Sequence, residues 1–180
     1  MAKSRFKDKV VSYSKAFKLS ARLGRNKKIG FATGVFDVLH LGHVFFLDSI
    51  KKKVDVLMVG VDDNETSKRI KGEDMPYFDE TERAQMLAVL SIVDYVFVFK
   101  GPCNQKILSE IKPTYYGVSP FDPVLTKKKK DAKKAGVKVF VSPYFLKSYS
   151  TSKVGRALRF SYLLSRSIYP SQRKDWNSLK

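Results

Sequence analysis

The chain has 180 residues, of which 43% are hydrophobic and 13% aromatic, so we expect one domain with a sizeable core. A single cysteine excludes a disulfide framework, and no apolar run approaches the roughly 20 residues of a membrane span. The N-terminus is charged and lacks the apolar centre of a signal peptide. These features predict a cytoplasmic protein without a membrane span.

The formal net charge of +18 is concentrated at the two ends of the chain. Residues 1–28 hold ten basic residues and one acidic residue, and residues 127–180 hold fifteen basic and two acidic residues. Residues 29–126 hold ten basic and fourteen acidic residues. Basic ends suit RNA, anionic lipid or acidic partners, but they are also compatible with solvated helix faces. Because the middle of the chain is slightly acidic, nucleic acid is not the favoured partner.

The hydrophobic pattern predicts strands that alternate with helices. An amphipathic helix within residues 3–26 ends near Gly24, and the expected strands are Lys28–Thr33, Asp55–Val61, Asp94–Phe99, Thr114–Val118 and Val137–Val141. The expected helices are Leu41–Lys52, Asp79–Leu90 (N-cap Asp79 or Thr81), Gln105–Ile111, Leu125–Ala135 and Thr151–Ser165. We expect a basic loop at Thr66–Gly72, and an exposed helix face at the lysine run Lys127–Lys130.

Strands that are apolar throughout are typical of a parallel sheet covered on both faces. We therefore predict an α/β fold with a Rossmann-like parallel five-stranded sheet, helices on both faces, an N-terminal helix and a basic C-terminal helix and tail. The expected division is a basic extension over residues 1–27, a central domain over 28–155 and the C-terminal helix and tail over 156–180. Right-handed crossovers place strand ends at one edge, so the first three strands and the loop Ser142–Tyr149 should meet at one cleft.

The stretch IGFATGVFDVLHLGHVFFL, residues 29–47, carries the strongest chemical signal. A buried strand leads through a turn into a helix, and the only two histidines, His40 and His43, sit three apart at its start. This spacing puts both imidazoles on one helix face, and the helix N-terminus offers backbone N–H groups that suit phosphate. A side chain at Gly42 would stand between that N-terminus and a phosphate. We predict a triphosphate-binding strand–turn–helix rather than a zinc site, which needs three or four ligands.

Three further positions are candidate phosphate contacts. Lys71 follows the second strand, Arg83 lies in the first turn of a helix, and the hydroxyl residues 150–152 precede the last helix. On position alone, a solvated lysine, a surface arginine and plain helix capping explain these residues equally well.

The residues Gly34–His43 resemble the GxFDxxHxGH signature of the cytidylyltransferase-like nucleotidyltransferases. Across residues 9–155 the order of features is similar to the adenylyltransferase domain of ADP-heptose synthases. Asp63–Gly72 resembles the NsDxSvKRlKG segment of that group, and Glu82–Val96 resembles its ERxxxLxxLxxVDxV block. Residues 150–152 stand where the family has STT, the loop that closes on the triphosphate.

The resemblance implies transfer of a nucleoside monophosphate from a nucleoside triphosphate to a phosphorylated sugar or alcohol, with release of pyrophosphate. The implied catalytic residues are His40, His43, Lys71 and Arg83. The implied nucleotide-binding residues are Thr33, Gly34, Val35, Phe36, Asp37, Gly42, Ser150, Thr151 and Ser152. Mg²⁺ is expected to enter with the triphosphate, held by few protein groups that the sequence does not identify. A homodimer is typical of such families.

Two departures leave the substrates open. Met75 replaces the arginine that the family usually has before a proline, and the segment Tyr116–Asp122 replaces a Lys-Gly-Gly-Asp stretch, for which Asp122 is a candidate substitute. ATP with a heptose 1-phosphate is the first expectation. The alternatives are CTP with glycerol 3-phosphate or a phospho-amino-alcohol, an adenylyltransferase for a cofactor precursor such as FMN, and a nucleotide- or nucleic-acid-binding protein with basic ends and little turnover.

Overall fold

The structure, a computed structural model, describes residues 6–103 and 105–144. The strands are β1 (Ile29–Gly34), β2 (Val56–Asp62), β3 (Tyr95–Phe99), β4 (Tyr115–Val118) and β5 (Lys138–Val141). After the short 3₁₀ turn η1 (Lys7–Lys9), the helices are α1 (Tyr13–Leu23), α2 (Leu41–Lys51), α3 (Asn64–Lys71), α4 (Glu80–Val89), α5 (Gln105–Ile111) and α6 (Leu125–Lys134). The predicted strands, and the predicted helices within these ranges, are confirmed. The expected helix Thr151–Ser165 lies outside the described residues.

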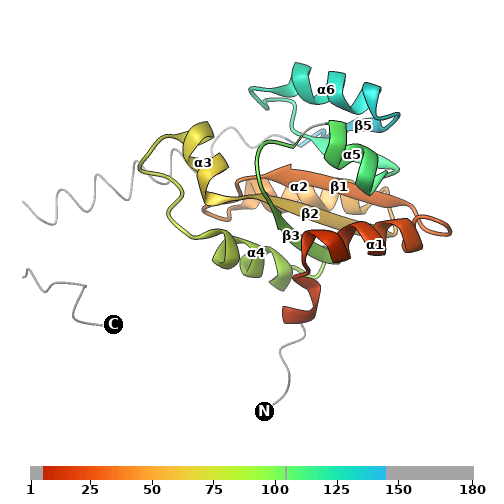
Figure 1. Cartoon of the computed structure of the whole chain (residues 1–180), viewed down its shortest axis with the longest axis horizontal. Helices are drawn as coiled ribbons and strands as arrows, with labels where there is room; N and C mark the ends of the chain where they lie inside the picture. Colours follow the sequence, from red (N-terminus) through yellow and green to blue (C-terminus); the bar gives the residue numbers. More distant parts are fainter. Residues whose placement is uncertain (1–5, 104, 145–180) are drawn as a thin grey trace, which may run out of the picture.

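The five strands form one parallel sheet in the order β3-β2-β1-β4-β5, which confirms the predicted fold class. Helices α2 and α4 cover one face, and α1, α5 and α6 cover the other, so that α1 stands in front of the sheet and α2 behind it in Figure 1. Alternate residues of each strand feed the two cores: Phe31 and Met58 point to one face, and Leu57 and Val59 to the other. None of the helices in the described ranges is long and apolar enough to cross a lipid bilayer.

Helix α2 packs closely onto β1 and β4 because two glycines face it. A Cβ atom on Gly117 would lie 2.1 Å from Cδ1 of Ile50, and one on Gly30 would lie 2.8 Å from Cγ2 of the same residue. Real Cβ atoms do not approach other heavy atoms so closely. The missing side chains therefore leave the space that Ile50 fills, and this packing fixes where the first turn of α2 meets the end of β1.

The predicted loop at Thr66–Gly72 is wrong, because this segment belongs to helix α3. Asp63 is the N-cap, and its side chain accepts a hydrogen bond of 3.0 Å from the backbone N–H of Thr66. The helix ends at Gly72, whose φ of 107° disfavours any residue with a side chain. The cap and the terminal glycine are both present in the sequence. The many charged residues between them, however, led to the prediction of a loop.

Of the two candidate N-caps for α4, the structure selects Asp79. Its carboxylate accepts hydrogen bonds from the backbone N–H groups of Thr81 and Glu82, at 2.7 and 2.9 Å. The side chain of Glu82 accepts in return from the N–H of Asp79 at 3.0 Å, which completes a capping box.

Candidate active site

A cavity of about 380 Å³ opens at the carboxyl ends of β1 and β4. One wall, which we call the near wall, consists of residues 33–43 and includes the turn after β1 and the first turn of α2. The opposite wall, the far wall, consists of residues 117–123 and Lys128. The ends of β2 and β3 were also expected at this cleft and do not line it, because the cleft opens between β1 and β4, and β2 and β3 lie on the other side of β1. Tyr144, from the predicted loop Ser142–Tyr149, does line it.

The cavity brings together most of the predicted site residues. Those lining it are Thr33, Gly34, Val35, Phe36, Asp37, His40, Gly42, His43 and Lys71. Arg83 does not line the cavity, and Ser150, Thr151 and Ser152 lie outside the described residues.

The two histidines stack at the start of α2. His40 is the N-cap residue, and its side chain makes no capping hydrogen bond, so the first backbone N–H groups of the helix are not occupied by a side-chain cap. The imidazole rings of His40 and His43 are 3.8 Å apart between centroids and inclined by 18°. The ring of Phe36 packs edge-on against His43 at 5.2 Å. This arrangement holds both imidazoles on one face of the helix, as the spacing predicted.

Burial and positive neighbours keep His43 uncharged at neutral pH. Burial is the largest cause that lowers its pKa, and His40 and Lys71 add to the effect, so that the pKa falls from 6.5 to about 3. Burial also lowers the pKa of His40. The Nδ1 atom of His43 is buried without a hydrogen-bond partner in the described part of the chain. A neutral imidazole offers a hydrogen bond without a charge, so positive charge at this wall comes from Lys71 and from the helix N-terminus.

Arg83 lies in the first turn of α4, as predicted, but its side chain does not line the cavity. Its side chain is fully buried. The guanidinium donates to the carbonyl oxygen of Val35 at 2.6 Å, to that of Phe78 at 3.0 Å and to Oδ1 of Asn64 at 2.9 Å. Arg83 thus ties the turn after β1 to the starts of α3 and α4, because one planar fork can reach three acceptors at once.

Asp37 reinforces the same connection. Its carboxylate, which is 1% exposed, accepts hydrogen bonds from the backbone N–H of Tyr77 at 2.9 and 3.0 Å and from that of Phe78 at 3.0 Å. Between these anchored positions, Phe36 adopts a φ of 48°, a conformation that costs a bulky residue about 1 kcal/mol or more. The anchors on either side hold this strained residue with its ring against His43.

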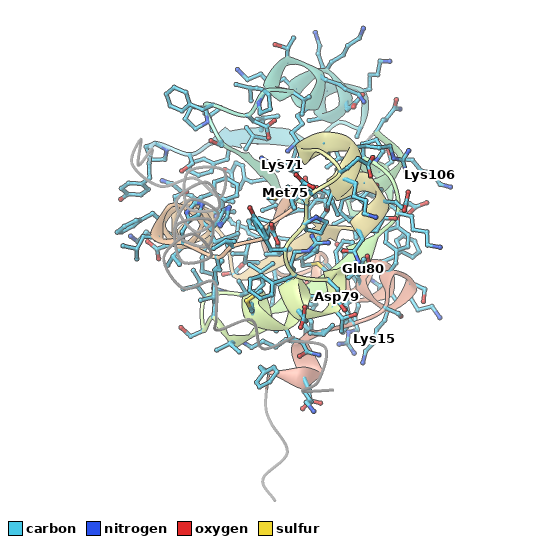
Figure 2. All side chains as sticks on the ribbon, turned by 90° about the vertical axis from the view of Figure 1, so that its left-hand side faces the viewer. Lys15, Lys71, Met75, Asp79, Glu80 and Lys106 are labelled. Atoms are coloured by element: carbon cyan, nitrogen blue, oxygen red, sulfur yellow. The ribbon has the colours of Figure 1, made fainter. Side chains whose placement is uncertain are left out.

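Lys71 and Met75 approach the cavity from the α3 end of the molecule. Figure 2 looks onto this end, with Lys71 on α3, Met75 on the segment after it, and Asp79 and Glu80 at the start of α4. Both Lys71 and Met75 line the cavity. Met75 therefore faces the cavity at the position where the related family usually has an arginine.

The far wall contains a residue that the sequence analysis missed. The lysine run was expected to be an exposed helix face, and Lys127, Lys129 and Lys130 are exposed, whereas Lys128 lines the cavity. Its Nζ lies 2.6 Å from Oδ2 of Asp122, and both side chains are 15% exposed. The pair joins a loop residue to a helix residue six positions later, a spacing for which no local pattern exists.

Thr33, which lines the cavity, belongs to a small hydrogen-bonded group of side chains. The hydroxyls of Thr33 and Tyr116 lie 2.8 Å apart. The thiol of Cys103 is hydrogen-bonded to the same two residues, and burial raises its pKa. A thiol that stays protonated is a poor nucleophile.

The fold and the cavity are those of an α/β domain that binds ligands at the strand ends. A family model described as cytidylyltransferase-like matches residues 31–155, and the chain belongs to this family of nucleotidyltransferases. The chain is 41% identical over 95 residues to the bifunctional protein HldE of Geobacter metallireducens, and 43% identical over 97 residues to that of Helicobacter pylori. These matches cover 53% of the chain in each case, and 19% and 21% of the two relatives, so the chain spans about a fifth of their length.

Two solved structures resemble this one. A lipopolysaccharide core biosynthesis protein from Thermoplasma volcanium is 32% identical, with a TM-score of 0.56 over 67% of this chain and all of that one. A pantoate–beta-alanine ligase from Francisella tularensis, 18% identical, has a TM-score of 0.66 over 92% of this chain and 79% of that one, which is a likeness of fold alone.

Proposed function

We propose that the chain transfers a nucleoside monophosphate from a nucleoside triphosphate to a phosphorylated sugar, with release of pyrophosphate. The observation that carries this proposal is the convergence of three groups on one cavity. They are the N-terminus of α2 without a side-chain cap, the stacked pair His40 and His43, and the cation of Lys71. Together they form an anion site of the kind that a triphosphate needs.

The reaction needs little covalent participation from the protein. A phosphate oxygen of the acceptor attacks the α-phosphorus, a new P–O bond forms, and the bond to the bridging oxygen breaks with its electron pair leaving on pyrophosphate. The proposed role of the near wall is to hold the triphosphate in line and to neutralise the developing charge. The helix N–H groups and neutral His43 supply hydrogen bonds there, and Lys71 supplies charge.

Arg83 enters the proposal as a positioning residue. It holds the turn after β1 through the carbonyl oxygen of Val35, and that turn carries Phe36, which packs on His43. Its contribution to the reaction is therefore the placement of the near wall rather than a contact with phosphate.

Mg²⁺ is part of the proposal only as a companion of the nucleotide. Within residues 6–103 and 105–144 no three histidine, cysteine, aspartate or glutamate side chains form a group able to hold a metal. In the proposal, the main ligands of the ion are therefore triphosphate oxygens. The ion would neutralise phosphate charge there. The homodimer and the cytoplasmic location remain predictions.

For the particular substrates we propose ATP and a heptose 1-phosphate. The identity of 41% and 43% to two HldE proteins over 53% of the chain supports this choice. Because the near wall is proposed to bind phosphates and not the base, CTP with a phosphorylated alcohol is the alternative pair of substrates.

The test is a panel of ATP, CTP, GTP and UTP against heptose, hexose and glycerol phosphates, read by pyrophosphate release. We expect Mg²⁺-dependent turnover with one pair, and a loss of at least about a hundredfold in kcat for His43→Ala, the scale of removing one positioned hydrogen-bond donor. Lys71→Ala should also reduce turnover, while Lys68→Ala, on the same helix but away from the cavity, is the matched control. Full activity of His43→Ala would contradict the mechanism. Binding of ATP without turnover of any pair would favour the non-catalytic alternative.

A further inference from the structure

The far wall contains a pair of opposite charges that the proposed phosphate chemistry does not use. Asp122 and Lys128 are joined at 2.6 Å, and each side chain is 15% exposed. The pair is held in place from both sides: Oδ1 of Asp122 accepts the backbone N–H of Val124 at 3.0 Å, and the Lys128 ammonium lies 6.0 Å from the ring centroid of Tyr116. Both residues face the cavity with a fixed geometry.

The charge balance of this wall does not suit an anion. Lys128 is neutralised by Asp122, and a second carboxylate, Asp62, is buried at the end of β2 close enough for the lysine charge to influence it. Lys128 is thus paired directly with Asp122, while Lys128 and Arg83 both act on the charge of Asp62. A phosphate placed here would meet no net positive charge and would lie close to the Asp122 carboxylate, a like charge in a half-buried setting.

A hydroxyl group, by contrast, fits both members of the pair. Each carboxylate oxygen of Asp122 keeps acceptor capacity beyond its one recorded bond, and the Lys128 ammonium has three donors, of which one is directed to Asp122. Adjacent hydroxyls on a ring present donors and acceptors at similar spacing. The side chain of Phe121, which is 62% exposed and also lines the cavity, adds an apolar surface for the C–H face of such a ring.

We propose that Asp122 and Lys128 bind the hydroxyl groups of a sugar ring, Asp122 as acceptor and Lys128 as donor. This inference rests on the proposed function, which brings two sugars to the cavity: the ribose of the nucleotide and the sugar of the acceptor. The far wall selects one of these substrates by its hydroxyls, and the near wall holds the phosphates.

The experiment compares the wild type with the double variant Asp122→Asn/Lys128→Gln, which keeps hydrogen-bonding side chains and leaves no single charge unpaired. The variant Lys130→Gln, at an exposed lysine of the same run, is the matched control. Thermal unfolding verifies that all three proteins fold. We expect the double variant to raise KM about tenfold to a hundredfold for one substrate, with kcat changed by less than about threefold. A higher KM for the nucleotide identifies the ribose, and a higher KM for the acceptor identifies the acceptor sugar.

Deoxy analogues show whether hydroxyls are what the pair binds. The probes are 2′-deoxy-ATP, 3′-deoxy-ATP and deoxy analogues of the best sugar phosphate, with tripolyphosphate as a probe that has no hydroxyl. The wild type should discriminate against one deoxy analogue, and the double variant should bind the parent and that analogue equally. Equal discrimination in both proteins, or KM values that match those of Lys130→Gln, would overturn the proposal. A parallel loss of tripolyphosphate affinity would also overturn it, because it would make the pair a phosphate contact.

The two proposals fail separately. If the wild type releases no pyrophosphate with any substrate pair, the proposed function fails. Calorimetric affinities for ATP, its deoxy analogues and sugar phosphates then decide the role of Asp122 and Lys128 on their own.

Discussion

The two walls of the cavity differ in how they are built. The near wall is a strand–turn–helix whose shape is held by buried hydrogen bonds from Arg83 and Asp37. The far wall is a loop and a helix joined by one ion pair, Asp122 with Lys128. The near wall matches the family signature, and the far wall departs from it. Under the proposed function, this difference assigns phosphate binding to the rigid part of the fold and substrate choice to side chains that a few substitutions can alter.

The largest effect is expected at Arg83, whose hydrogen bonds hold the near wall in shape. Replacing it with methionine leaves the carbonyl oxygens of Val35 and Phe78 and the amide of Asn64 without their donor, so the free energy of unfolding should fall by about 3–5 kcal/mol. Urea denaturation measures this loss. Because such a change is a large part of the stability of a typical domain, Arg83→Lys serves as the milder variant, with an expected loss of about 1–3 kcal/mol.

The same variants distinguish a positioning residue from a phosphate contact. If Arg83→Lys keeps the wild-type unfolding free energy and still loses about a hundredfold in kcat, then Arg83 contacts phosphate in the reacting complex, as the sequence predicted. A loss of stability together with activity supports the role that the structure gives it.

The electrostatic environment of Lys128 in the far wall is tested at Asp62 of β2. Burial is the main cause that raises its pKa from 3.8 to about 6, while Lys128 and Arg83 act against it. A raised folded-state pKa means that the stabilising contribution is complete below pH 3.8 and is lost as the pH rises through 6. Asp62→Asn should therefore be more stable than the wild type above pH 6, by up to about 3 kcal/mol, and the gain should vanish below pH 3.8.

Urea unfolding between pH 3.5 and 8 measures this gain. The lowered pKa of His43 acts in the opposite sense, since its contribution is complete above pH 6.5 and is lost as the pH falls toward 3. Both proteins keep His43, so their difference isolates Asp62. The same substitution at exposed Asp8 controls for loss of a negative charge. A gain that does not depend on pH would show that Asp62 is not a strained carboxylate.

Gly117 tests whether the walls are independent. It lies in β4 at the far wall, yet it faces Ile50 of the helix that carries the histidines. Gly117→Ala should cost about 1–3 kcal/mol by overpacking, measured by thermal or urea unfolding. Ile50→Val removes the methyl group that a Cβ would meet, so the double variant should be more stable than the sum of the single changes predicts. Strict additivity would mean that the contact is not the cause.

The fold was largely predictable because its signals are local. Apolar strands, caps such as Asp79 and stops such as Gly24 lie within a few residues of the elements that they define, and the predicted boundaries of strands and helices in the described ranges differ from the structure by one residue. Helix α3 was missed because its charged composition outweighed its cap. The ends of β2 and β3 were expected at the cleft together with that of β1, whereas β4 lines it with β1, since strand order is a tertiary property that no local window contains.

The site was predictable to the extent that it is one continuous motif. His40 and His43 were found from their spacing, which places them on one face, and the structure adds that their rings stack. Arg83 was predicted to contact phosphate, and the structure shows its guanidinium bound to Val35, Phe78 and Asn64 instead of lining the cavity, because a motif records a residue type and not which way its side chain points. Lys128 was missed because four adjacent lysines look alike until the rest of the fold places one of them against Asp122.

The order β3-β2-β1-β4-β5 puts β1 beside β4, although α2, β2, α3, α4, β3 and α5 come between them in the chain. The connection between β4 and α6 is thus separate in sequence from the turn after β1 and the start of α2, where we propose that the triphosphate binds. Under the proposed function, evolution or engineering could change the acceptor by replacing that one connection, while the residues that hold the pyrophosphate stay the same.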